Sequence, residues 1–416
     1  MYNKRSKTVP AGIHLVRIVL AVVFIASGFL KGVDPWSGAI KMGEYFSAFG
    51  MEWLDGVRFP LAIGQAAFEM WLGLMLLFNL WRTFTRFFVL LFMVFFTGLT
   101  LFIALTNPVS DCGCFGDAIP LTNWQTFFKN LVLLPLSILL FAHIRREIVT
   151  RPIRSRYGIV AILAVLALWP GLRGLRSLPA IDFLPYKVGA NLPSKIVVAP
   201  EDRGESHTTL IYRDRASGQE QEFEVSDTTW YDTLRWEFVD TRTVVLSEGK
   251  EPEINNFVLF NAQQDMTDWV LTRQEVFLLV ADRLEEVDER TAERFARVGR
   301  FAEQNNIPVV CLTISSLEKE AEFQQKIGLP IPCLNVDATT LKTMLRAHRG
   351  MILLERGTII AKMNLRQMPD FEKAGVHSGL EYVAAKGRAG GEKLFIAGYL
   401  LLILGLLLGG RKRCNE

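Results

Sequence analysis

The stretch FTRFFVLLFMVFFTGLTLFIALT, residues 84–106, is long and apolar enough to cross a lipid bilayer as a single helix. An α-helix rises about 1.5 Å per residue, so roughly 20 apolar residues are needed to cross the hydrocarbon core. Other stretches of the 416-residue chain have the same character, and together they predict a multi-pass α-helical membrane protein. The six predicted spans are residues 13–32, 60–80, 84–106, 123–143, 158–178 and 394–410.

The positions of the basic residues predict the orientation of these spans. Lys and Arg are enriched in short cytoplasmic loops. Here they gather before the first span, between the second and third, between the fourth and fifth, and after the sixth, whereas residues 107–123 have none. We therefore expect an inner (cytoplasmic) membrane protein with both termini cytoplasmic and residues 179–393 extracytoplasmic. The net charge is only +3 and is concentrated in these loops, which indicates topology and not nucleic-acid binding.

The loop between the third and fourth spans contains two of the five cysteines, Cys112 and Cys114, in the stretch DCGCFG. Cysteines of apolar proteins are usually scattered and inert, so two thiols one residue apart favour a redox dithiol. A structural disulfide and coincidence are the alternatives. A Cys-Gly-Cys disulfide closes a small ring that is easier to reduce than a structural bridge and adds little stability. Asp111 and Asp117 flank the pair and would raise the pKa of its thiols, whereas a helix start near Thr122 would lower it.

Glu69 stands out within the second predicted span. An ionisable group near the midplane is costly, so it either serves the function, through a proton or a quinone, or makes a hydrogen bond to another span. Gln65 lies one turn away on the same face. In the first span, Ser27 and Gly28 predict a close helix contact, and Lys31 is expected to extend towards the headgroups.

The segment between the first two spans predicts a further helix. Apolar residues at helical spacing in residues 39–49 indicate an amphipathic helix at the outer interface, with Trp36 and Trp53 as headgroup anchors. An ordinary packed loop helix is the alternative. The five histidines are dispersed and none pairs with a cysteine at ligand spacing, so no metal site is predicted.

The region after the fifth span has the character of a soluble protein. Residues 180–270 show alternation typical of strands, and from residue 271 strands alternate with helices up to a hairpin at 351–363. Strand, helix, strand, helix and hairpin is the order of a thioredoxin-like α/β domain. The redox motif of that fold would follow the first strand, where residues 281–286 read ADRLEE and contain no cysteine.

Three cysteines lie outside the loop. Cys311 falls inside a predicted strand and is expected to be a buried thiol, whereas Cys333 is either buried or an exchange partner. Cys414, in the basic tail, is expected to be an idle thiol on the reducing side.

Taken together, SGFLKGVDP (residues 27–35), Glu69 and CGCFG (residues 112–116) resemble the DoxX family, and within it the MauE-like branch of redox-associated membrane proteins. The resemblance covers about residues 10–150 and implies a four-helix transmembrane core. The stretch LKTMLR, residues 341–346, is similar to a DoxX subgroup with a degenerate thioredoxin-like extension. MauE proteins are associated with methylamine utilisation and the maturation of an exported dehydrogenase, and other DoxX proteins with quinone-coupled sulfur oxidation. The resemblance implies a redox setting for Cys112 and Cys114.

The sequence therefore predicts a membrane-bound thiol–disulfide redox protein, an oxidoreductase in chemical terms, that uses Cys112 and Cys114 on exported partner proteins. Quinone is the cofactor that coupling near Glu69 would require. The alternative is a non-catalytic membrane scaffold or assembly factor whose thioredoxin-like domain binds partners. The predicted domains are the DoxX/MauE-like core (1–150), the fifth helix (151–179), a β-rich segment (180–270), the thioredoxin-like domain (271–392) and the sixth helix with its basic tail (393–416).

Overall fold

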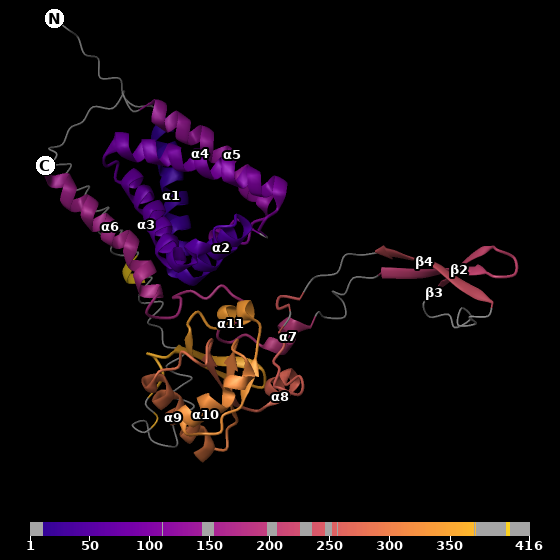
Figure 1. Ribbon diagram of the computed structural model, residues 1–416. Helices are drawn as coiled ribbons and strands as arrows, with labels where there is room; N and C mark the ends of the chain where they lie inside the picture. Colours follow the sequence, from indigo (N-terminus) through magenta and orange to yellow (C-terminus); the bar gives the residue numbers. More distant parts are fainter. Residues whose placement is uncertain are drawn as a thin grey trace, which may run out of the picture.

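The computed structural model places a bundle of long helices at one end of the molecule and a mixed sheet with its own helices at the other (Figure 1). The structure describes residues 11–109, 111–143, 154–197, 206–224, 235–245, 252–255, 257–369, 371 and 397–399. Of the predicted sixth span, 394–410, only residues 397–399 are among these, and Cys414 lies outside them.

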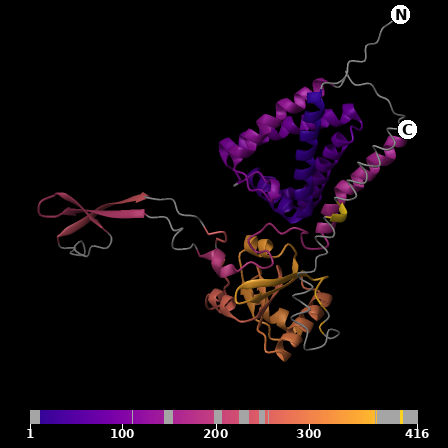
Figure 2. The same ribbon diagram turned by 180° about the vertical axis from the view of Figure 1, so that it is seen from behind.

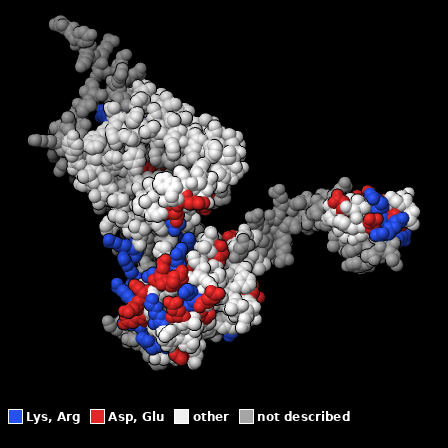
Figure 3. All heavy atoms as spheres, viewed as in Figure 1, with Lys and Arg blue, Asp and Glu red and all other residues white. Residues whose placement is uncertain are grey.

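Five described helices are long and apolar enough to cross a membrane, which agrees with the five spans predicted before residue 179. They comprise α1 (Ala11–Val33), α3 (Arg58–Leu77) with the short 3-10 helix Glu52–Val57 before it, α4 (Arg82–Thr106), α5 (Asn123–Ala142) and α6 (Arg154–Gly174). Away from its end near the sheet domain, the visible surface of the bundle carries very few charged side chains, whereas Lys, Arg, Asp and Glu are abundant on the sheet domain (Figure 3). This distribution is that of a multi-pass membrane protein.

Glycines let α1 and α3 approach closely. A Cβ atom on Gly28 would lie 2.5 Å from the backbone nitrogen of Met70, and one on Gly73 would lie 2.7 Å from that of Ile25. Side chains at either position would force the helices apart, so the predicted contact at Gly28 is confirmed. The crossing also sets the carboxyl-terminal part of α1 opposite the middle of α3.

Helix α2 (Pro35–Ala48) lies at the end of the bundle that faces the sheet domain (Figure 1). Asp34 caps it by accepting hydrogen bonds from the backbone N–H groups of Trp36 and Ser37, at 3.1 and 3.2 Å, and proline takes the first helical position. The prediction that Trp36 is a headgroup anchor is wrong. The helix begins four residues earlier than predicted, and the indole, 6% exposed, packs against Phe59. Trp53 is 80% exposed, as an interfacial residue requires.

The sheet domain contains five strands in the order β7–β6–β5–β8–β9. Their bounds are β5 Val276–Ala281, β6 Val309–Thr313, β7 Cys333–Asn335, β8 Arg349–Glu355 and β9 Thr358–Asn364. Strands β5, β6 and β7 are parallel, whereas β8 is antiparallel to β5 and β9 is antiparallel to β8. The predicted hairpin is therefore confirmed.

Helices cover both faces of this sheet, so its strands are buried on two sides. All six residues of β5 are buried, and alternate ones join two separate apolar cores. The helices are α7 (Leu192–Ile196), α8 (Thr267–Thr272), α9 (Glu289–Gln304), the 3-10 turn Leu317–Lys319, α10 (Glu320–Ile327) and α11 (Ala338–Met344). Helix α11 lies on the side of the sheet that faces the bundle (Figure 1).

A separate antiparallel sheet projects sideways in both views (Figures 1 and 2). It consists of β2 (Ser206–Asp214), β3 (Glu220–Glu224) and β4 (Trp236–Val245), in the order β3–β2–β4. Aromatic rings of Tyr212, Phe223 and Trp236 pack across it. These strands lie in the segment that was predicted to be β-rich.

Candidate functional site

The cysteine loop joins α4 to α5 at the end of the bundle nearest the sheet domain. Asn107 ends α4 in the left-handed conformation, and Thr122 starts α5 with a capping box completed by Gln125. The predicted helix start near Thr122 is thus confirmed. Between them the short strand β1 (Cys114–Asp117) lies along α1. Gly113 has φ of +63°, a conformation that glycine adopts without strain, so the chain can reverse between the two thiols.

Hydrogen bonds from the bundle fix the backbone of both cysteines. The hydroxyl of Ser27 on α1 donates to the carbonyl oxygen of Cys114 at 2.6 Å. The phenol of Tyr45 on α2 donates to that of Cys112 at 3.2 Å. The pair is therefore held by two different helices.

The two thiols are neighbours with different proton affinities. Their Sγ atoms lie 3.3 Å apart; Cys112 is buried and Cys114 is half-buried. A hydrogen bond from the Cys112 thiol lowers the pKa of Cys114 to about 6, with help from Lys129 and Lys31 and against the effect of burial. The same hydrogen bond, together with burial, raises the pKa of Cys112. Cys114 is thus the thiolate near neutral pH, and Cys112 keeps its proton.

Each of the two aspartates that flank the thiols forms an ion pair. Asp111 forms an ion pair with Lys41 of α2 at 3.0 Å. Asp117 forms one with Arg346 of the sheet domain at 2.5 Å. Lys41 also pairs with Glu44, and Arg346 with Asp34, so each cation offsets the charge of its flanking aspartate only in part.

Glu69 and Lys31 form a buried ion pair beside the cysteines. The Lys31 ammonium lies 2.7 Å from the Glu69 carboxylate, and their side chains are 12% and 8% exposed. Lys31 therefore points into the bundle and not towards the headgroups, which corrects the sequence prediction. Both residues, with Cys114 and Lys129, line a cavity of about 30 Å³, large enough for a water molecule.

A larger pocket lies beside the thiols. Its volume is about 250 Å³, and Cys112 and Cys114 form part of its wall together with Phe95 and Phe96 of α4. Next to it, an apolar groove of about 700 Å³ runs between α3 and α4. Gln65 and the two phenylalanines line both spaces.

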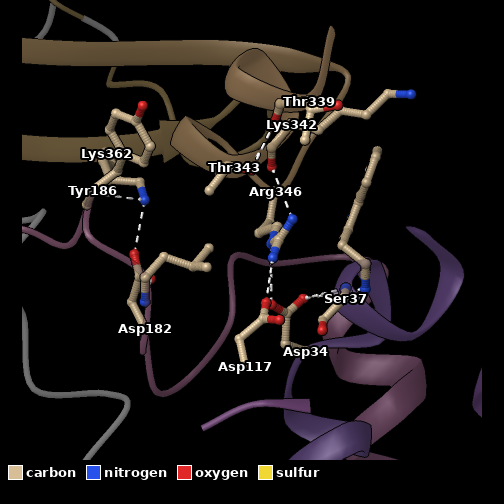
Figure 4. A network of polar contacts seen from close by, with 12 residues as sticks. Asp34, Ser37, Asp117, Asp182, Tyr186, Thr339, Lys342, Thr343, Arg346 and Lys362 are labelled. Carbon is tan, nitrogen blue, oxygen red and sulfur yellow. Dashed lines mark hydrogen bonds and ion pairs between the residues drawn. The ribbon is translucent and has the colours of Figure 1, made fainter. Parts of the chain in front are cut away.

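Figure 4 shows the second network of the site, where the sheet domain meets the bundle. Arg346 follows α11, and its side chain is 4% exposed. Its Nε donates to Asp34 at 3.0 Å, its Nη2 to Asp117 at 2.5 Å and its Nη1 to the carbonyl of Lys342 at 3.2 Å. The ring of His348, which is hydrogen-bonded to Asp282, packs on Trp36.

The two described cysteines of the sheet domain lie in its hydrophobic core. Cys311 and Cys333 are register partners on β6 and β7, 0% and 1% exposed. Burial raises the pKa of Cys311. The prediction of a buried Cys311 is confirmed, and for Cys333 the structure favours the buried alternative over an exchange partner.

Several residues of the site were missed by sequence reasoning. Lys41, Tyr45 and Lys129 looked like ordinary residues of helices or loops, and only the fold brings them to the thiols. Arg346 lies 229 positions from Asp117, so no local spacing could have paired them. A signal did exist for Lys31, because it lies in the SGFLKGVDP stretch.

The fold and the site define a multi-pass membrane protein with a dithiol at the junction between its helix bundle and a sheet domain. Residues 9–143, which comprise α1 to α5, match the family model of the methylamine utilisation protein MauE. This part of the chain is thus similar to MauE, and the five long apolar helices make the chain a multi-pass membrane protein. No curated protein matches it.

Proposed function

We propose that this protein is a membrane-bound thiol–disulfide redox protein that supports disulfide exchange in, or maturation of, exported partner proteins. The observation that carries the proposal is the pair of thiols 3.3 Å apart, one with a lowered and one with a raised pKa. A structural disulfide would not require this asymmetry. The match to MauE supports an accessory role of the kind that its name associates with methylamine utilisation.

The exchange chemistry follows from this asymmetry. In the reduced protein the Cys114 thiolate attacks a partner disulfide, a mixed disulfide forms and one partner thiolate leaves. Cys112 then loses its proton and attacks the Cys114 sulfur, which releases the second partner thiolate and leaves the Cys112–Cys114 disulfide. The same steps in reverse oxidise a partner dithiol. Two electrons move in either direction.

Coupling to a quinone is supported by the pocket beside the thiols. Its aromatic wall and its continuation into the apolar groove between α3 and α4 suit a lipid-soluble ring that enters from the bilayer. Oxidation of the dithiol by a quinone balances as two thiols plus quinone giving disulfide plus quinol. Glu69, paired with Lys31, would accept or supply protons through the small cavity behind Cys114.

The sheet domain is proposed to be a thioredoxin-like domain without redox cysteines. The order β6–β5–β8–β9, with the first two strands parallel and the last two antiparallel, supports this. Asp282 directly follows β5, where the redox motif of a thioredoxin would lie. The described residues 281–286 contain no cysteine. The rival function, a scaffold that binds partners through this domain, is favoured by the absence of a thiol there.

The orientation in the inner membrane is also proposed from the basic loops. Ion pairs from Arg346 to Asp34 and Asp117 put the cysteine loop and the sheet domain at the same end of the bundle. This is what the predicted topology, with both termini cytoplasmic and residues 179–393 outside, requires.

Redox titration of Cys112 and Cys114 in native membranes, followed by alkylation and mass spectrometry, tests the proposal. We expect a reversible two-electron couple at a potential above about −300 mV, below which structural disulfides lie. The Cys112→Ser and Cys114→Ser variants should each lose exchange with a peptide disulfide. Full exchange in the double variant, or a disulfide that resists reduction, would leave the scaffold function.

A further inference from the structure

The cysteine loop is held at both ends by ion pairs, and the two cations come from different parts of the molecule. Lys41, on α2 of the bundle, holds Asp111 before the pair at 3.0 Å. Arg346, on the sheet domain, holds Asp117 after the pair at 2.5 Å. The chain between the two aspartates contains both cysteines. Its geometry therefore depends on the sheet domain as well as on the bundle.

The guanidinium of Arg346 is held in place by three hydrogen bonds. Each of its three nitrogens makes one hydrogen bond, to Asp34, Asp117 and the carbonyl oxygen of Lys342 (Figure 4). The hydrogen bond to Lys342 fixes the guanidinium to α11. The carboxylates of Asp34 and Asp117 are therefore held in a fixed position relative to the sheet domain. Planar multidentate contacts of this kind are specific to Arg.

The bundle side of the contact is equally well defined. One oxygen of Asp34 caps α2, and the other accepts from Arg346. Asp34 is buried, which raises its pKa, while Arg346 opposes that shift. Near the guanidinium of Arg346, Trp36 packs on His348 with ring centroids 4.7 Å apart. Polar and aromatic contacts thus join the two parts around the cysteine loop.

We propose that Arg346 is a positioning residue for the Cys112–Cys114 pair and that the sheet domain acts in cis as the part of the protein that holds the cysteine loop in its reactive geometry. This rests on the proposed redox function of the pair. It gives the domain a role that needs no thiol of its own. When Arg346 fixes Asp117, β1 remains packed along α1. Cys112 then remains buried, and its thiol remains hydrogen-bonded to the sulfur of Cys114.

The test is the pH dependence of alkylation of each cysteine in the full-length, reduced protein in lipid nanodiscs, read by mass spectrometry. In the unaltered protein Cys114 should become half reactive near pH 6, while Cys112 reacts slowly. Arg346→Gln and Asp117→Asn should each raise the Cys112 rate at least ten-fold. Each substitution should also move the pH at which Cys114 is half reactive towards about 8.5, the pKa of an ordinary thiol.

The direction of the shift separates positioning from a direct charge effect. Removing a nearby positive charge raises a thiol pKa, and removing a nearby negative charge lowers it. A direct effect therefore predicts opposite shifts for Arg346→Gln and Asp117→Asn, whereas positioning predicts the same upward shift. The double variant should match Arg346→Gln, because that substitution already breaks the contact with Asp117 that Asp117→Asn removes. Opposite shifts, additive effects or unchanged rates would overturn the proposal.

Arg349→Gln is the matched control. Arg349 lies three positions along the same segment and pairs with Asp288 within the sheet domain, at 3.7 Å. Arg349→Gln should leave the alkylation rate and pH dependence of both cysteines unchanged. An effect equal to that of Arg346→Gln would show that the domain is generally destabilised, and it would overturn the proposal. If Arg346→Gln does not fold, Asp117→Asn decides the question. Alkylation needs no partner, so failed exchange with peptide disulfides would count only against the redox function.

Discussion

At the scale of single residues, the pair of Lys31 and Glu69 explains how a membrane bundle keeps two charges. Each is nearly buried, and the 2.7 Å contact between them replaces the water that each has lost. Desolvation of an unpaired ion inside a protein costs several kcal/mol, which a close partner offsets. The pair also lines the cavity behind Cys114, so its charges act on the thiol that forms the thiolate.

Single and double substitutions distinguish a structural from a functional ion pair. Lys31→Met leaves the Glu69 carboxylate buried and unpaired, so it should destabilise the protein by about 3 kcal/mol. Glu69→Gln in the same chain should restore most of that loss. Thermal unfolding in detergent measures both effects.

Activity of the stable double variant then assigns the role of the pair. If Lys31→Met/Glu69→Gln exchanges thiols as the unaltered protein does, Glu69 serves only as a link between spans. Loss of quinone reduction with retained peptide-disulfide exchange would assign it to the quinone step. The two interpretations open from the sequence are thereby separated.

At the scale of elements, the contact between α1 and α3 is set by glycine. A Cβ on Gly28 would meet the backbone of Met70, which cannot move aside as a flexible side chain can. This contact positions Ser27 and Lys31, which hold the cysteine loop and Glu69. Helix packing and the geometry of the site are therefore linked.

Gly28→Ala should accordingly lower the stability of the bundle by about 1–3 kcal/mol, the usual range for overpacking. Gly98→Ala is the matched control, because a Cβ there meets nothing within 4 Å. It should change stability by less than about 1 kcal/mol. Equal unfolding temperatures for the two variants would show that α1 and α3 do not pack in this way.

The sequence predicted the elements better than the contacts between them. Apolar length and alternation are local properties, so the spans before residue 179 and the hairpin at 351–363 could be found. Trp36 was misplaced because the capping role of Asp34 was not recognised, and the helix therefore begins at Pro35. Lys31 was misread for a different reason, since its partner on α3 is fixed only by the helix crossing.

At the scale of the whole molecule, the contacts of Arg346 bind the sheet domain to the end of the bundle that carries the cysteine loop. A polypeptide that crosses the bilayer five times before residue 179 must then expose the opposite end of the bundle on the other side. That opposite end includes His143, which caps α5. The cysteine loop and the sheet domain share one compartment.

Cysteine labelling with a membrane-impermeant maleimide tests this arrangement together with the direction of insertion. Both variants, Ser217→Cys and His143→Cys, are made in a chain in which Cys112, Cys114 and Cys414 are replaced by Ser. Ser217→Cys, in the exposed turn after β2, should then be labelled from the extracytoplasmic side of intact cells, because the proposed topology puts the sheet domain outside. His143→Cys should be labelled only in inverted vesicles. If Ser217→Cys and His143→Cys are both labelled from the same side, the two ends of the bundle do not lie on opposite sides of the bilayer. If the two sides are exchanged, the cysteine pair faces the reducing cytoplasm, where a stable disulfide is not expected and exchange with exported proteins has no substrate.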